Sequence, residues 1–69
     1  MKKIKDRNEL MQWAADNYSI EQNSEGTPEQ ALMAGWVNAM DMEEEQGGLT
    51  DDDFIRISYY ECQNMGYID

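Results

Sequence analysis

Carboxylates are the most abundant side chains in this sequence that could take part in chemistry. Of its 69 residues, 15 are Asp or Glu, one is Cys and none is His. The lack of His removes the commonest general base and the commonest metal ligand, and a single cysteine cannot build a structural zinc site. Carboxylates, hydroxyls and one thiol suit a binding protein better than an enzyme. We therefore expect no catalytic residue, no metal and no cofactor.

The densest group of acids lies in residues 41–53, a segment without any basic residue. Neighbouring like charges repel, so such a segment is typical of a solvated face or of a surface to which a basic partner supplies the counter-charge. Tyr60 lies off the apolar stripe of its segment, and tyrosine is enriched at interface hot spots. The candidate partner-binding residues are Asp41, Glu43, Glu44, Glu45, Asp51, Asp52, Asp53 and Tyr60.

A calcium-binding loop is one alternative for the acidic segment. Counted from Asp41, acids fall at ligand positions 1, 3 and 5 of an EF-hand register. Gln46 stands where that loop needs glycine, and Asp52 stands where it needs a bidentate glutamate. We therefore expect only weak association with divalent ions.

Two further chemistries are weighed against ordinary packing. Cys62 would act as a nucleophile only if a base or a positive neighbour activated its thiol. The sequence has no His, and Glu61 precedes the cysteine, so we expect Cys62 to be a small core residue. A carboxylate pair such as Glu43 and Asp51 imitates a hydrolase site, but a chain this short does not form a deep pocket.

The charge is unevenly distributed along the chain. Residues 1–7 carry four basic residues and one acid, whereas residues 8–69 carry fourteen acids and one basic residue, for a total of −10. Affinity for nucleic acid comes from Lys and Arg that neutralise phosphates, so we expect no direct binding to DNA or RNA. The charge suits the opposite role, in which the protein imitates nucleic acid. A compact anionic protein of this kind occupies a basic groove that otherwise holds DNA or RNA.

The sequence also carries no sign of membrane insertion or secretion. No run approaches the roughly 18 apolar residues that a membrane span needs, and no apolar stretch follows the basic start as in a signal peptide. The lone cysteine cannot form an internal disulfide, which fits a reducing cytosol. We expect a cytoplasmic protein without a membrane partner.

Start and stop signals divide the chain into three helical segments. The first helix starts at Asp6, which forms a capping pattern with Glu9, and ends near Tyr18. The basic segment of residues 1–6 is expected to be flexible. The remaining residues complete a single acidic helical domain over residues 1–69.

The second helix has the clearest signals of the three. Thr27 followed by Pro28 predicts its start, and the glycine pair 47–48 predicts its end after Gln46. Small residues spaced by four, with Gly35 in the middle, lie beside a stripe of large apolar residues. Since glycine weakens an exposed helix by roughly 1 kcal/mol relative to alanine, its presence indicates a tight crossing with another backbone.

The third helix is predicted from Thr50, which caps a first turn of three acids, to a stop at Gly66. A strand is the alternative for residues 54–60, because β-branched and aromatic residues alternate there with others. No second candidate strand exists for it to pair with, so we favour the helix.

Three helices with short connections predict an all-α fold, a small three-helix bundle. One apolar stripe from each helix should face the interior. The expected core is Leu10, Trp13, Ala14, Leu32, Gly35, Trp36, Ala39, Met40, Phe54, Ile55, Tyr59 and Cys62.

Residues 29–36 read Glu-Gln-Ala-Leu-Met-Ala-Gly-Trp, similar to an A-x-x-A-G-W-like run in short phage reading frames. With the very short, acidic, His-free chain, this run resembles the small acidic proteins encoded by bacteriophages and other mobile elements. The resemblance covers about eight residues and carries over no functional residue. It implies a protein that binds and inhibits a host enzyme or a defence complex.

Charge and resemblance lead to one functional expectation and one alternative. We expect a small acidic phage-type protein that binds a nucleic-acid-handling host protein through an anionic surface and inhibits or modulates it. It would act in the bacterial cytoplasm as a DNA mimic or an anti-defence inhibitor. The alternative is a non-enzymatic helical protein–protein interaction module, for example a homodimer held by its apolar stripes, since a short chain gains stability by oligomerising.

Overall fold

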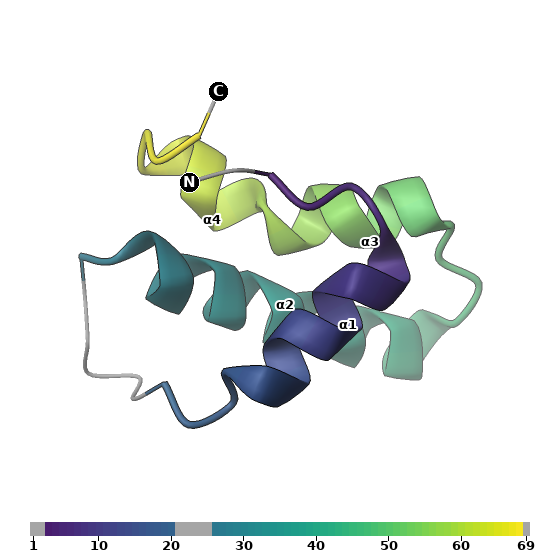
Figure 1. Cartoon of the computed structure of the whole chain (residues 1–69). Coiled ribbons are helices and arrows are strands. Elements are labelled where there is room, and N and C mark those ends of the chain that lie inside the picture. Colours follow the sequence, from purple (N-terminus) through teal and green to yellow (C-terminus); the bar gives the residue numbers. More distant parts are fainter. Residues whose placement is uncertain (1–2, 21–25, 69) are drawn as a thin grey trace.

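The computed structural model describes residues 3–20 and 26–68 of the chain (Figure 1). Within these ranges the structure is helical and contains no strand. The helices are α1 (Arg7–Asp16), α2 (Pro28–Gln46), α3 (Asp51–Ser58) and α4 (Tyr60–Asn64). The predicted all-α class is confirmed, and the strand alternative for residues 54–60 is wrong. Among the helices of the described ranges, none is long and apolar enough to cross a membrane.

Each of the three longer helices begins at the cap that its sequence predicts. The side-chain oxygens of Asp6, Thr27 and Thr50 each accept a hydrogen bond from a backbone N–H of the first turn, at 2.7 to 3.2 Å. These bonds satisfy donors that have no partner within the helix. α2 ends at Gln46 and is capped by Gly47, whose φ of 71° suits glycine and whose N–H donates to the Glu43 carbonyl at 2.7 Å.

The third predicted helix is divided into α3 and α4 at Tyr59. The preceding residue, Ser58, is buried, and its hydroxyl donates to the Phe54 carbonyl at 2.8 Å. A serine that bonds back to the carbonyl four residues earlier often bends a helix. The predicted stop at Gly66 is confirmed: the Tyr67 N–H donates to the Cys62 carbonyl at 2.9 Å around a left-handed glycine.

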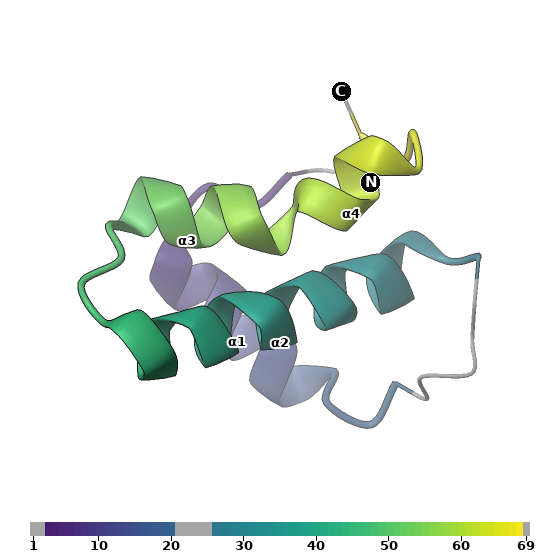
Figure 2. The same ribbon diagram turned by 180° about the vertical axis from the view of Figure 1, so that it is seen from behind.

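The α3–α4 pair runs antiparallel beside α2, and α1 crosses one face of this arrangement (Figure 1). Figure 2 shows the other face, where α2 and α3 stand in front and α1 lies behind them. The interior between the helices holds most of the predicted core, although Trp13, Trp36 and Met40 are half-buried at its edge. The buried apolar residues are Leu10, Ala14, Ala31, Leu32, Met33, Ala39, Phe54, Ile55, Tyr59 and Cys62.

Gly35 brings the backbone of α2 against that of α3, as its predicted role in a tight crossing requires. A Cβ atom at this position would overlap the Ser58 carbonyl oxygen and lie 2.8 Å from the carbonyl carbon. Ordinary van der Waals contact begins at 3.4 Å. Only glycine therefore fits at this point of the α2–α3 contact.

The chain before α1 lies against the helices. The Ile4 N–H donates to the buried Tyr59 hydroxyl at 2.8 Å, and the Ile4 side chain packs against the core. The Lys3 ammonium lies 5.7 Å from the centre of the Tyr59 ring, within the range of a cation–π contact. Residues 1 and 2 of the basic segment lie outside the described residues.

Candidate partner-binding surface

The structure divides the seven predicted carboxylates among different surroundings. Glu43 faces α1, where one of its oxygens accepts a hydrogen bond from Arg7 Nη2 at 2.6 Å. Arg7 Nη1 also lies 3.9 Å from an oxygen of the exposed Asp51, and Arg56 pairs with Asp53 at 2.9 Å. Three of the seven carboxylates are thus balanced by the protein's own arginines.

The contact between Arg7 and Glu43 belongs to the packing of the molecule. Both side chains are largely covered, and Glu43 Oε2 is buried without a hydrogen-bond partner among the described atoms. The Arg7 guanidinium also lies over the Phe54 ring, 4.4 Å from its centre. The arginine therefore ties the start of α1 to both α2 and α3. Glu43, a predicted partner-binding residue, is already paired inside the protein and is not available to a partner.

Asp41, Glu44, Glu45 and Asp52 have different surroundings. All four are exposed, and within the described residues no basic side chain forms an ion pair with them. They lie on the last turns of α2 and the first turn of α3, which the short connection at residues 47–50 brings to the same end of the molecule (Figure 1). This end carries carboxylates available to a partner.

A groove lies between the second half of α2 and the α3–α4 junction, and we call it the α2–α4 groove. Its volume is about 700 Å³. Met42, Ile57 and Tyr60 give it an apolar lining, and Asp41 and Glu45 line it from α2. It therefore joins three predicted site residues, since Tyr60 is 60% exposed and lies beside two of the carboxylates.

Sequence reasoning missed two charged residues of the α2–α4 groove, Arg56 and Glu61. Arg56 lies in α3, before the division of the third predicted helix at Tyr59, and Glu61 lies in α4, after it. The chain changes direction at this division, so α4 continues along α2. The four-residue spacing of Asp41 and Glu45 was a usable signal, because such residues share a helix face. Nothing local in the sequence indicates that Glu61 lies across from them.

The EF-hand alternative is wrong, because α2 continues to Gln46 through the residues that would begin the loop. Asp41 and Glu43 consequently face different surroundings, the groove and Arg7. In the part of the chain that the structure describes, no three His, Cys, Asp or Glu side chains are grouped so as to hold a metal ion.

Cys62 is confirmed as a core residue. It is buried, and its Sγ lies 3.6 Å from the Pro28 carbonyl oxygen. Burial raises the pKa of the Cys62 thiol above its ordinary value of 9.0, and the negative charges of Glu29 and Glu61 raise it further. Its surroundings therefore favour the unreactive thiol over the thiolate.

Tyr59 is the second titratable group whose surroundings disfavour its charged form. Burial raises the pKa of its hydroxyl above the ordinary 10.0, an effect that the hydrogen bond from the Ile4 N–H partly offsets. The neutral hydroxyl therefore serves as a buried acceptor for the segment before α1.

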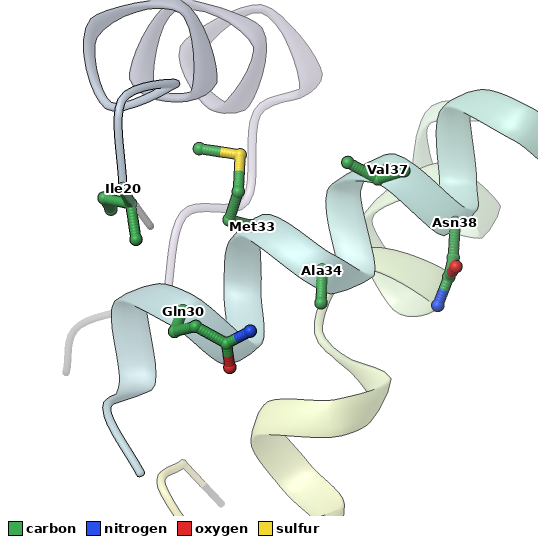
Figure 3. A pocket seen from close by; sticks show the side chains of 6 residues that line it. All are labelled: Ile20, Gln30, Met33, Ala34, Val37 and Asn38. Atoms are coloured by element: carbon green, nitrogen blue, oxygen red, sulfur yellow. The ribbon is translucent and has the colours of Figure 1, made fainter. Parts of the chain in front are cut away.

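A smaller apolar pocket lies near the start of α2 and is lined from α2 and from Ile20 (Figure 3). Its volume of about 270 Å³ is below the range of roughly 300–1,000 Å³ typical of small-molecule sites. In Figure 3, Ile20 lies near Met33, and Val37 and Asn38 continue the lining along the helix. The pocket lining is Ile20, Gln30, Met33, Ala34, Val37 and Asn38.

Comparisons with known proteins add no family. No family model, curated protein or solved structure matches this sequence. The resemblance of residues 29–36 to short phage reading frames stays a prediction. Within α2, Leu32 and Gly35 of that run are buried, so part of its pattern serves the packing of the helix.

Proposed function

We propose that this chain is an acidic binding protein that docks onto a basic surface of a nucleic-acid-handling protein and inhibits or modulates it. The observation that carries the proposal is the set of exposed carboxylates without an ion-pair partner at one end of the molecule, Asp41, Glu44, Glu45 and Asp52. Capped helices hold these side chains on a packed frame. A cationic partner therefore meets the charges already in place, which lowers the entropy lost on binding.

The magnitude of the charge supports a role as a nucleic-acid mimic. The molecule carries −10 over a longest dimension of 31 Å. One strand of B-DNA carries one phosphate for each 3.4 Å of helix axis, so roughly nine over the same length. The two charges are comparable, and a basic groove that holds a strand of nucleic acid would attract this protein with an association rate that falls as salt rises.

The biological setting of the proposal comes from the resemblance to small acidic phage proteins. We infer that the partner is a bacterial host protein, such as a nuclease or a component of a defence complex, and that the encounter takes place in the host cytoplasm. We also propose that the fold is a small three-helix bundle, in which α1, α2 and the α3–α4 pair are the three helices. In this proposal the chain contributes contacts and charge, and it carries out no reaction itself.

The experiment is capture from a bacterial lysate on the immobilised chain, followed by elution in steps of increasing salt. The test variant reverses three carboxylates, Glu44→Lys, Glu45→Lys and Asp52→Lys. A control with the same change in charge, Glu9→Lys with Asp16→Lys and Glu29→Lys, alters exposed acids of α1 and of the start of α2. We expect the first variant to lose a salt-eluted nucleic-acid-handling partner that the control retains. Equal capture by both variants would refute the proposal.

A homodimer is the second candidate, and the apolar pocket near the start of α2 favours it (Figure 3). Val37 lines this pocket and is half-buried, so a second copy seated on the pocket would bury it further. The charge of −10 on each copy opposes self-association. Sedimentation at low and high salt separates the candidates: a dimer that strengthens with salt supports this one, and a monomer in both conditions refutes it.

A further inference from the structure

We propose that the α2–α4 groove binds a basic amphipathic helix of the partner protein, and this inference rests on the proposed function. The groove joins an apolar lining to carboxylates on the side of α2 that α1 leaves open. The binding mode would be a helix in a groove, in which apolar side chains at helical spacing enter the groove and charged side chains contact its edges.

The protein's own α1 indicates the kind of ligand that this helix arrangement accepts. α1 packs across the other face with its apolar residues Leu10 and Ala14 buried. At its start, Arg7 reaches the Glu43 carboxylate on the second half of α2. An amphipathic helix with a basic residue near its start is therefore already packed against α2 and α3. The α2–α4 groove offers the same combination of apolar and acidic groups on the opposite side.

Charge complementarity selects a basic occupant for the groove. Asp41 and Glu45 line it one helical turn apart on α2, and Glu61 lines it from α4. Arg56 is the basic residue of the lining, and its guanidinium is already paired with Asp53 at 2.9 Å. The lining thus offers three carboxylates against one engaged arginine, which disfavours a second copy of this acidic chain.

The size and lining of the groove suit side chains from a helix. Its volume is about 700 Å³, room for several apolar side chains and more than a single ion needs. Tyr60 is 60% exposed at the groove, and an exposed tyrosine offers a large, rigid contact to a partner. Ile57 and Met42 are half-buried beside it, so a bound helix would cover apolar surface that water now contacts.

The probe is a fluorescein-labelled peptide of about 16 residues, long enough to form a helix on binding, with Leu at helical spacing on one face and Lys on its flanks. The control peptide has the same composition in scrambled order, so it keeps the charge and loses the apolar face. Fluorescence anisotropy against the whole protein measures affinity at low and moderate salt. Backbone amide shifts from NMR then show whether the peptide perturbs the residues of the groove.

Matched variants separate the groove from the general acidity of the molecule. Glu45→Gln and Glu44→Gln remove the same charge from adjacent residues, of which Glu45 lines the groove and Glu44 does not. Tyr60→Ala is paired with Tyr18→Ala, an exposed tyrosine that packs edge-on against Trp36 away from the groove. We expect Tyr60→Ala to weaken peptide binding about tenfold and Glu45→Gln about threefold, with little change in either control.

Three results would overturn the inference. They are failure of the amphipathic peptide to bind, equal binding of the scrambled peptide, and equal effects of the paired variants. None of these removes the proposed function, which the charge reversal in the lysate experiment tests by itself. If capture depends on Glu44, Glu45 and Asp52 while Tyr60→Ala changes nothing, the acidic surface is functional and the helix-binding groove is not.

Discussion

Substitution of Gly35 by alanine tests the closest contact in the fold. At an exposed position inside a helix, this change stabilises a protein by roughly 1 kcal/mol, because alanine is the better helix former. Gly35 is instead buried against the backbone of Ser58. We therefore expect Gly35→Ala to destabilise the protein, in the opposite direction to helix propensity.

The size of the effect follows from the geometry. The new Cβ would overlap the Ser58 carbonyl oxygen and lie 2.8 Å from the carbonyl carbon, whereas ordinary contact begins at 3.4 Å. The carbon alone would require a shift of about 0.6 Å, and the oxygen requires α2 and α3 to separate by more than that. The obstructing atoms are backbone, which cannot rotate away as a side chain can. Overpacking of this kind costs about 1–3 kcal/mol, equivalent to a fall in melting temperature of about 5–20 °C for a domain of this size.

Urea unfolding followed by the fluorescence of Trp13 and Trp36 measures the effect. Ala34→Gly, at the preceding half-exposed position, calibrates helix propensity in this helix, and we expect it to cost about 1 kcal/mol. Gly48→Ala gives the cost of alanine at a left-handed residue, since its φ is 71° and no atom lies within 4 Å of the added Cβ. A Gly35→Ala variant as stable as the original chain, or more stable, would refute the packing described for α2 and α3.

Three further predictions concern the buried polar groups. Arg7→Met should lower the free energy of unfolding by about 1–3 kcal/mol, because it leaves the partly buried Glu43 carboxylate unpaired. The control Arg56→Met removes an exposed ion pair and should cost about 0–1 kcal/mol. Thermal melting measures both variants, and equal effects would contradict the structure. Alkylation of Cys62 should be slow at neutral pH and become rapid in urea, as mass spectrometry would record, because the thiol is buried and its pKa is raised; rapid labelling of the folded chain would contradict its burial. The raised pKa values of Cys62 and Tyr59 mean that the folded state binds these protons more tightly than the unfolded state. The contribution of both groups to stability should therefore be complete below their ordinary pKa values of 9.0 and 10.0. It should fall as the pH rises through these values towards the raised pKa values of the folded state. Urea midpoints that stay constant across this alkaline range would disprove that coupling.

Local chemistry made the helix boundaries predictable. Asp6, Thr27 and Thr50 cap the helices that the sequence predicts from them, because a cap bond joins residues only two or three positions apart. The division of the third helix at Tyr59 was not predicted. It depends on the buried Ser58, whose neighbour across the interior is Gly35 on another helix, and that contact is set by tertiary packing.

The candidate site was predictable in composition and less so in arrangement. The sequence identifies the acids of residues 41–53, and the structure finds Glu43 engaged by Arg7, which lies 36 positions away. A pairing over that distance leaves no local pattern. Tyr60 was expected to be exposed because it lies off the apolar stripe, and it is. Its position beside Asp41 and Glu45 in the groove follows from how α4 packs on α2, which periodicity alone does not specify.

The hydrogen bond from the Ser58 hydroxyl to the Phe54 carbonyl lies inside the molecule, yet it helps to shape the outside. Tyr60 and Glu61, two and three residues after this serine, line the α2–α4 groove, so their direction depends on the bend that the buried serine supports. A substitution at Ser58 would thus alter recognition indirectly, by changing the direction of the side chains on the turn that follows it. Ser58 is fully buried, so it would influence binding at the groove without contacting the bound partner.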